Sequence, residues 1–152
     1  MKKIFCALIV AVILLFVTIN FTPKKIFVFA EVNEAKKIIT IINAKKNLPL
    51  KINFVHSVQK TPVIEELNFD GDNFILLRTI YKSHGVGLPF LESDGNFCEE
   101  DGKFIFDNMN RKIKNLELRT GKGTKLSVEL DNQLFELYKI FPAGTKIIFA
   151  VR

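Results

Sequence analysis

The chain has 152 residues, 48% of them hydrophobic, and a formal net charge of +6. This length is sufficient for one domain with a hydrophobic core and short for two. Four of the 22 basic residues, Lys2, Lys3, Lys24 and Lys25, flank the first apolar run, and all 16 acidic residues follow it. Residues 26–152 therefore carry 18 basic against 16 acidic side chains, a net charge of +2. Nucleic-acid binding requires a concentrated basic surface, so we expect no nucleic-acid partner.

The first 25 residues form a targeting segment. Residues 4–21 are an uncharged apolar run, preceded by two lysines and closed by Thr-Pro-Lys-Lys. As a helix this run would be about 27 Å long, close to the thickness of a bilayer core. This length favours an uncleaved single-pass membrane anchor, with the N-terminus in the cytoplasm and residues 26–152 outside it. The alternative is cleavage after Ala30, which would give a secreted protein.

The two cysteines are Cys6, inside the apolar run, and Cys98. The part of the chain after the run therefore holds a single cysteine and cannot close an internal disulfide. We expect packing rather than cross-links to hold the domain together.

Short runs rich in β-branched and aromatic residues recur after residue 25, separated by turn signals, and no window keeps apolar residues at helical spacing for long. The predicted strands are 26–32, 38–42, 50–58, 63–69, 74–82, 97–100, 103–106, 116–119, 125–130, 134–138 and 146–151. Asp-Gly at 101–102 is a strong hairpin signal. This pattern predicts an all-β domain, built as a sandwich or a partly closed barrel of short antiparallel strands.

Two ionisable residues fall in apolar rows of neighbouring strands. His56 lies in the row that begins at Leu50, and Glu65 in the row that begins at Val63, because side chains alternate across a strand. A hairpin loop at 59–62 would place His56 opposite Glu65 on the buried side. The pair could be a structural hydrogen bond, the lining of a ligand pocket, or an acid and a base in catalysis. A Ser57–His56 dyad is disfavoured, because neighbours on a strand point to opposite faces.

Residues 81–89 read Tyr-Lys-Ser-His-Gly-Val-Gly-Leu-Pro and end a predicted strand with two glycines and a proline. They predict either a turn with unusual backbone angles or a loop whose bare backbone a ligand can approach closely. The segment lacks the third glycine and the strand–helix context of a dinucleotide fingerprint. His56, His84 and Glu65 lack diagnostic metal-ligand spacing. We therefore expect neither a cofactor nor a metal.

Residues 54–65 and 81–89 resemble the bacterial domain-of-unknown-function family DUF1850. The similarity extends over nearly the whole chain, including residues 108–111 and 142–145, and its His-Ser-Val, Thr-Pro-Val and Gly-x-Gly-x-Pro elements are specific only in combination. It implies a secreted or membrane-anchored protein that is often encoded beside tripartite (TRAP) transporters with a TAXI-type solute receptor and a fused permease. It implies no reaction.

Carrying the family motif over marks a cluster for binding a ligand or a partner: His56, Ser57, Thr61, Pro62, Glu65, Tyr81, Ser83, Gly85, Gly87 and Pro89. His84 stands where many relatives have an aromatic residue. The leading hypothesis is a membrane-anchored accessory or ligand-sensing domain that contacts a transporter permease or solute receptor. The alternatives are an extracytoplasmic hydrolase that uses His56 and Glu65, and a purely structural envelope protein.

Overall fold

The computed structural model describes residues 4, 8, 9, 11, 12, 24–32 and 34–152. The predicted targeting run, residues 4–21, lies for the most part outside the described residues. No helix within the described part of the chain has both the length and the apolar character to cross a membrane. Retention or cleavage of the N-terminal segment therefore stays a prediction.

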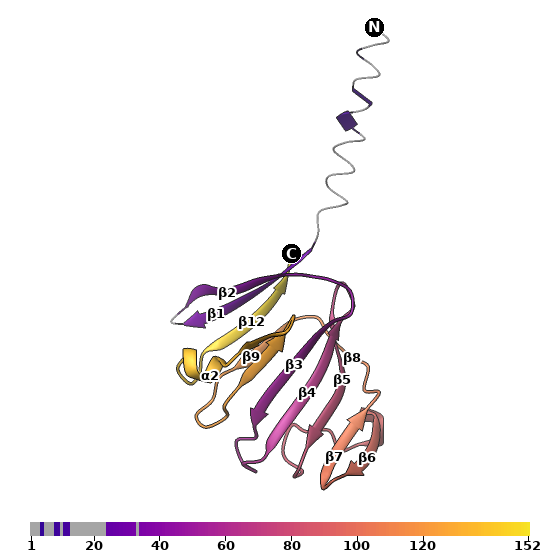
Figure 1. Cartoon of the computed structure of the whole chain (residues 1–152), viewed down its shortest axis with the longest axis vertical. Helices are drawn as coiled ribbons and strands as arrows, with labels where there is room; N and C mark the ends of the chain where they lie inside the picture. The colour runs from indigo at the N-terminus through magenta and orange to yellow at the C-terminus, as the bar shows by residue number, and fades with distance from the viewer. Residues whose placement is uncertain (1–3, 5–7, 10, 13–23, 33) are drawn as a thin grey trace.

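The domain consists of two antiparallel sheets (Figure 1). In chain order the strands are β1 (Lys25–Val32), β2 (Ala35–Asn43), β3 (Leu48–Val55), β4 (Pro62–Phe69), β5 (Phe74–Tyr81), β6 (Asn96–Glu100), β7 (Lys103–Asp107), β8 (Arg111–Ile113), β9 (Leu116–Arg119), β10 (Ser127–Leu130), β11 (Gln133–Phe135) and β12 (Lys146–Val151). Sheet A has the order β2-β1-β12-β9. Sheet B has the order β11-β10-β3-β4-β5-β7-β6, and β8 pairs with β5. The prediction of an all-β domain of short antiparallel strands is confirmed.

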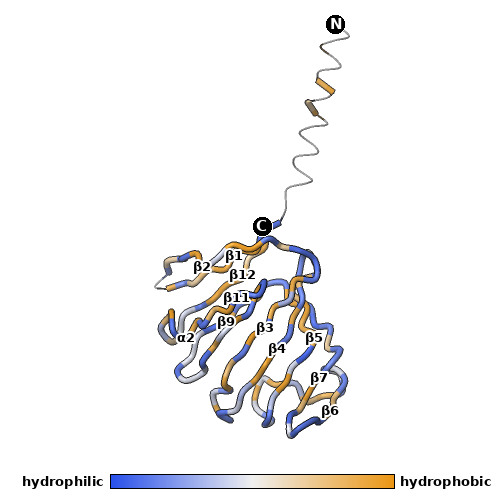
Figure 2. Tube along the Cα trace, viewed as in Figure 1, coloured by the Kyte–Doolittle hydropathy of each residue, from blue (hydrophilic) through white to orange (hydrophobic). Residues whose placement is uncertain are grey.

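One hydrophobic core lies between the two sheets. Side chains from β1, β9 and β12 of sheet A pack with side chains from β3, β4, β5 and β10 of sheet B. The rings of Phe74 on β5 and Phe149 on β12 meet edge to face, with centroids 6.0 Å apart. Figure 2 shows hydrophobic residues along the strands of both sheets and hydrophilic residues in many of the connecting loops. The two antiparallel sheets thus share one core.

A second, smaller core lies on sheet B. Val63 of β4, Tyr81 of β5 and Phe106 of β7 are buried there with Leu88, which comes from the loop after β5. Phe54 packs against both cores. This loop, residues 82–91, holds most of the second segment of the family resemblance, and we call it the motif loop. Leu88 therefore fixes the motif loop to the sheet.

Within residues 34–152 the helical segments are short: a 3-10 turn, η1 (Glu92–Asp94), and α2 (Leu137–Ile140). The predicted strand at 134–138 is wrong over its second half, because β11 ends at Phe135 and Leu137 begins α2. The Leu137 side chain is fully buried in the main core. The chain leaves strand β11 and forms a helical turn at the position where this side chain enters the core. The short strand β8 was not predicted, because its sequence Arg-Lys-Ile carries no alternating apolar row.

Candidate functional site

The hairpin between β3 and β4 turns earlier than the sequence predicts. Val55 pairs with Pro62 and Ile52 pairs with Glu65, whereas His56 is joined to Thr61 by a backbone hydrogen bond of 2.9 Å. The predicted pairing of His56 with Glu65 is therefore wrong. The cause is local: the turn occupies the residues directly after His56, and Lys60 closes it with a φ of 54°.

The His56 side chain organises this turn. The ring is buried, as the apolar row predicted. Its Nδ1 atom accepts hydrogen bonds from the backbone N–H groups of Val58, at 3.3 Å, and Gln59, at 3.1 Å. Its Nε2 atom lies 3.2 Å from the carbonyl oxygen of Val86. Because Nδ1 accepts, the proton is on Nε2 and is donated to Val86. His56 thus joins the 57–60 turn to the loop after β5.

Gly85 makes this junction possible. A Cβ atom at this position would lie 2.7 Å from Cε1 and 2.8 Å from Nε2 of His56, which is too close for any side chain. The sequence predicted either an unusual turn or close approach of a ligand at the two glycines. The structure shows an unusual backbone angle at Gly87, with a φ of 88°, and at Gly85 a close approach of the His56 ring.

Tyr81 holds the other end of the same loop. Its ring is 1% exposed, and its hydroxyl donates to the carbonyl oxygen of Pro89 and lies 3.4 Å from Nδ1 of His84. Burial, and after it the negative charge of Asp94, raises the pKa of the Tyr81 phenol. The His84 ring stacks on Phe104, with centroids 4.5 Å apart. The loop is therefore anchored at both ends by bonds to its own backbone.

The other predicted site residues are divided between two places. Ser57 is exposed on the β3–β4 turn, Pro62 is exposed at the first position of β4, and Ser83 is half-buried in the loop after β5. The Thr61 hydroxyl is buried and has no hydrogen-bond partner among the described residues. The structure thus brings His56, Gly85, Tyr81 and Pro89 into one assembly, with the turn residues beside it.

Glu65 belongs to a different environment. It lines a cavity of about 270 Å³ between the sheets, together with Ile52, Phe54, Glu117, Leu118, Arg119, Thr124 and Leu126. Burial raises the pKa of the Glu65 carboxyl, and the positive charge of Arg111 partly offsets this effect. Within the described residues, this carboxylate makes no hydrogen bond or ion pair.

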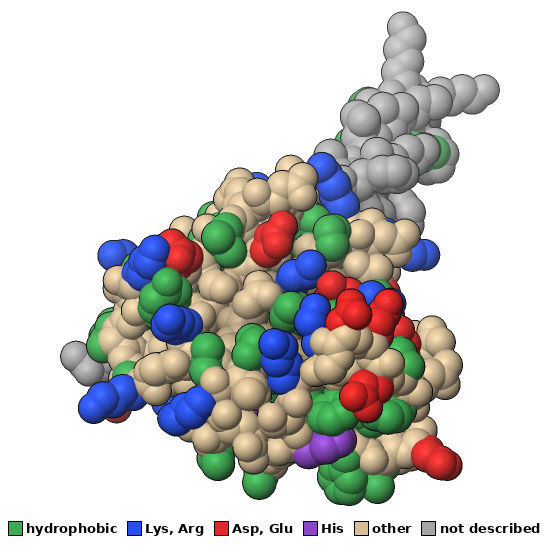
Figure 3. All heavy atoms as spheres, turned by 60° about the horizontal axis from the view of Figure 1, so that its bottom comes forward, with side chains coloured by type: hydrophobic (Ala, Val, Ile, Leu, Met, Phe, Trp, Pro, Cys, Tyr) green, Lys and Arg blue, Asp and Glu red, His purple; other side chains and the backbone are tan. Residues whose placement is uncertain are grey.

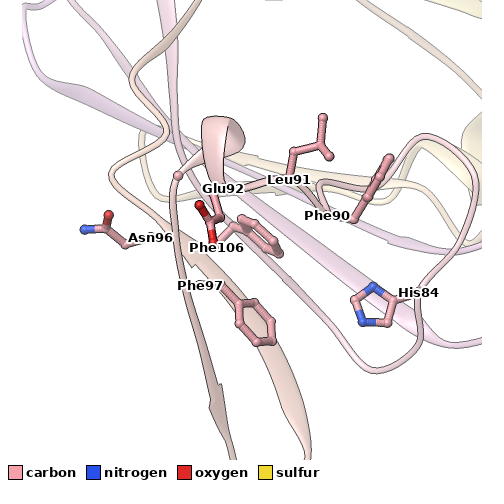
Figure 4. A pocket seen from close by; sticks show the side chains of 8 residues that line it. His84, Phe90, Leu91, Glu92, Asn96, Phe97 and Phe106 are labelled. Atoms are coloured by element: carbon pink, nitrogen blue, oxygen red, sulfur yellow. The ribbon is translucent and has the colours of Figure 1, made fainter.

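A larger cavity, of about 600 Å³, lies on the far side of the motif loop, and sequence reasoning missed it. Its lining is His84, Phe90, Leu91, Glu92, Gly95, Asn96, Phe97 and Phe106 (Figure 4). In Figure 4 the Glu92 carboxylate lies beside the Phe106 ring, and Asn96 points away from the other side chains. Figure 3 shows hydrophobic side chains beside a histidine at one edge of the molecule, with acidic side chains next to them. We call this cavity the aromatic pocket.

Asp94 shapes the wall of the aromatic pocket. One of its carboxylate oxygens accepts hydrogen bonds from the backbone N–H groups of Phe90 and Leu91, each at 3.1 Å. These two bonds lower the pKa of the Asp94 carboxyl, and the bond from Leu91 has the larger effect. They hold the chain in a turn that leaves Phe90 70% exposed and Leu91 51% exposed. Phe97, on β6, is 52% exposed.

The His, Cys, Asp and Glu side chains of the domain are dispersed. Within residues 24–32 and 34–152 and the few described positions before them, no three His, Cys, Asp or Glu side chains are placed to hold a metal ion. Cys98 is a free, exposed cysteine.

Comparison with known proteins gave one match. No curated protein matches the chain, and no solved structure does. The model of the family described as "Domain of unknown function (DUF1850)" matches residues 50–137. This range is more than half of the chain and contains the β3–β4 turn, the motif loop and the aromatic pocket. The chain therefore belongs to the DUF1850 family.

Proposed function

We propose that this chain is a bacterial, membrane-anchored extracytoplasmic domain that binds a small solute in its aromatic pocket. It serves as a ligand-sensing accessory to a solute transporter of the TRAP type with a TAXI-type receptor. The aromatic pocket supports this proposal more than any other feature. Large apolar side chains are normally buried, so three of them exposed around one concave surface favour a binding role. The pocket also adjoins the loop that carries the family motif.

The lining of the pocket selects the chemistry of the ligand. Phe97 and Phe106 are close ring neighbours, with centroids 5.2 Å apart, and Phe90 and His84 provide further ring surface. Glu92 is the acidic side chain of the lining. A carboxylate beside aromatic faces favours a cation, which gains from both the charge and the ring quadrupoles. The expected solute has an apolar or ring-shaped body and an amino group.

Catalysis by His56 has no support in the geometry. Both ring nitrogens are engaged with backbone groups, so neither is free to take a proton from a substrate. Glu65 lies opposite Ile52 rather than His56. A hydrolase that uses the two residues together is therefore not proposed, and His56 is assigned a positioning role for the motif loop.

The location and the partner rest on the sequence. Residues 4–21 have the length of a membrane anchor, and the family resemblance implies a neighbouring permease and solute receptor. Sequencing the N-terminus of the mature protein tests the anchor: a mature chain that starts at Glu31 would refute it. Photo-cross-linking from position 90 in native membranes tests the partner, because the exposed Phe90 side chain lies on the pocket rim.

Ligand binding is tested by thermal shift with a panel of aromatic amines, amino acids and dicarboxylates. We expect aromatic amines to raise the melting temperature of the parent chain and dicarboxylates to leave it unchanged. Phe97→Ala should abolish this shift, and Glu92→Gln should weaken it. Leu134→Ala is the matched control, because Leu134 is 62% exposed on β11, outside the pocket. A panel without effect on the parent chain, or equal shifts in the Phe97 and Leu134 variants, would contradict ligand sensing at this pocket.

A further inference from the structure

Part of the outer face of sheet A is apolar where a solvated sheet is normally polar. On β1, Ile26, Val28 and Ala30 point into the core and are almost fully buried. Phe27 and Phe29 point to the other side of the same strand, with stacked rings whose centroids are 6.0 Å apart. A strand that is apolar on both faces is typical of a sheet covered on both sides.

The neighbouring strands extend this surface. In the register of sheet A, Phe27 lies between Ile41 of β2 and Ala150 of β12, and Phe29 lies between Ile38 and Ile148. Paired residues share a face of the sheet, so these side chains lie together on the outside. Ile38 is 51% exposed and Ile41 is 48% exposed. We call the surface formed by Phe27, Phe29, Ile38, Ile41, Ile148 and Ala150 the outer patch.

The outer face of sheet B carries a different kind of surface. Lys51 of β3 pairs with Glu66 of β4 at 3.2 Å, Arg78 of β5 lies 3.6 Å from Glu66, and Arg78 also pairs with Asp107 of β7. This cross-strand ladder of charges is the usual solution for a sheet face in water.

The six residues of the outer patch are all apolar. Charged residues of the same face lie at one end of it: Lys146 pairs with Glu117 at 2.8 Å, and Glu31 lies between Lys36 and Lys146 in the register of the sheet. The patch itself therefore requires a different covering.

Basic side chains border the outer patch. Lys25 and Arg152, at the adjoining ends of β1 and β12, are exposed and alternate onto the same face as Phe27 and Ala150. Lys36 is exposed on β2, two residues before Ile38. A surface that combines Phe and Ile with a rim of Lys and Arg is suited to the headgroup region of an anionic bilayer.

We propose that the outer patch rests on the membrane surface, with its Phe and Ile side chains among the lipid headgroups and its basic rim against anionic lipid. This inference depends on the anchoring in the proposed function. β1 begins four residues after Phe21, the last residue of the apolar run, a distance of at most about 14 Å along the chain. Figure 1 shows β6 and β7, which line the aromatic pocket, at the opposite end of the molecule from β1. Docking through sheet A therefore leaves the pocket open to the aqueous phase.

The chain contains no tryptophan, so single substitutions provide clean fluorescent reporters. The full chain is reconstituted in vesicles of phosphatidylcholine and phosphatidylglycerol that contain lipids with a quencher near the headgroup. Ile41→Trp should show blue-shifted emission and strong quenching, and both should weaken in vesicles without phosphatidylglycerol. Phe97→Trp is the matched control: Phe97 is 52% exposed and lies in the aromatic pocket, so its quenching should be several-fold weaker.

The outcomes separate the two proposals. A chain that fails to co-sediment with vesicles contradicts the anchor. A chain that co-sediments but shows equal quenching at positions 41 and 97 keeps the anchor and overturns docking of the outer patch. A blue shift at position 41 that depends on protein concentration and not on the lipid quencher means that a second copy of the chain covers the patch, which also overturns membrane docking.

Discussion

Gly85 and His56 are in contact at a distance that only glycine permits. A Cβ atom of residue 85 would stand only 2.7 Å from Cε1 of the His56 ring, and three backbone groups hold the ring there. The His56 imidazole thus joins the motif loop to the β3–β4 turn, and the absence of a side chain at Gly85 leaves the space for it.

Gly85→Ala should therefore lower the free energy of unfolding by about 1–3 kcal/mol, the usual cost of overpacking a tight contact. Chemical denaturation measures the change. The control is the same substitution in a His56→Ala background, where the ring is gone and space is available. There Gly85→Ala should cost clearly less, because residues in contact are not additive. Equal costs in the two backgrounds would mean that the contact with the His56 ring is unimportant.

Tyr81→Phe should destabilise the chain by about 1–2 kcal/mol, because it removes a buried hydrogen bond and leaves the Pro89 carbonyl without its donor. Tyr138→Phe is the matched control, since the Tyr138 hydroxyl bonds to Glu136 at an exposed position. That variant should unfold like the parent. Similar losses at both positions would show that the loop does not depend on the Tyr81 hydroxyl.

Glu65→Gln should stabilise the chain at neutral pH. Because burial raises the folded-state pKa of this carboxyl above its unfolded value, ionisation disfavours the fold, and this penalty grows as the pH rises from the unfolded pKa through the folded one. The amide has the same shape and no charge. Melting temperatures measured from pH 4 to pH 8 should converge at the acid end and diverge at the neutral end. A variant that is less stable than the parent at neutral pH would indicate that the carboxylate has a stabilising partner.

Asp94→Asn should loosen the wall of the aromatic pocket. The hydrogen bonds from Leu91 and Phe90 lower the folded-state pKa of Asp94, so its contribution is present above the unfolded pKa and is lost as the pH falls through the folded value. Hydrogen exchange of the Phe90 and Leu91 amides should therefore be faster in the variant at neutral pH. After correction for the intrinsic effect of pH, the difference should disappear in acid. Unchanged exchange at neutral pH would show that Asp94 does not hold this turn.

The strand pattern was readable from sequence wherever apolar rows of period two ended at a strong turn signal. Predicted strands 63–69, 116–119 and 146–151 agree with β4, β9 and β12 to within one residue. The pairing of β1 with β12 was not readable, because nothing local to either strand specifies a partner so distant in the chain.

The candidate site was only partly predictable. The motif segments did converge, through His56, Gly85 and Tyr81. The register of Glu65 failed because the His56 side chain, by bonding to the N–H groups of Val58 and Gln59, starts the turn before the apolar row is exhausted. Alternation of apolar residues does not predict that one of their side chains will bond to the backbone and so terminate the strand. The aromatic pocket was not predicted, because the exposure of Phe90 and Leu91 depends on the turn that Asp94 fixes, and no local pattern of apolar residues reveals such a turn.

The position of β12 in sheet A sets an order of folding. β3, β4 and β5 are joined by successive hairpins. This part of sheet B can therefore form as soon as residue 81 has left the ribosome during synthesis. β1 has β2 on one side, but its other edge is filled by β12 and β12 in turn by β9. Sheet A is therefore completed last, when β12 pairs with β1. Because these two strands lie at opposite ends of the domain sequence, their pairing is a long-range contact, and such contacts slow folding. Until then one edge of β1 stays open to other chains, so loss of the final strand would make the protein prone to aggregation.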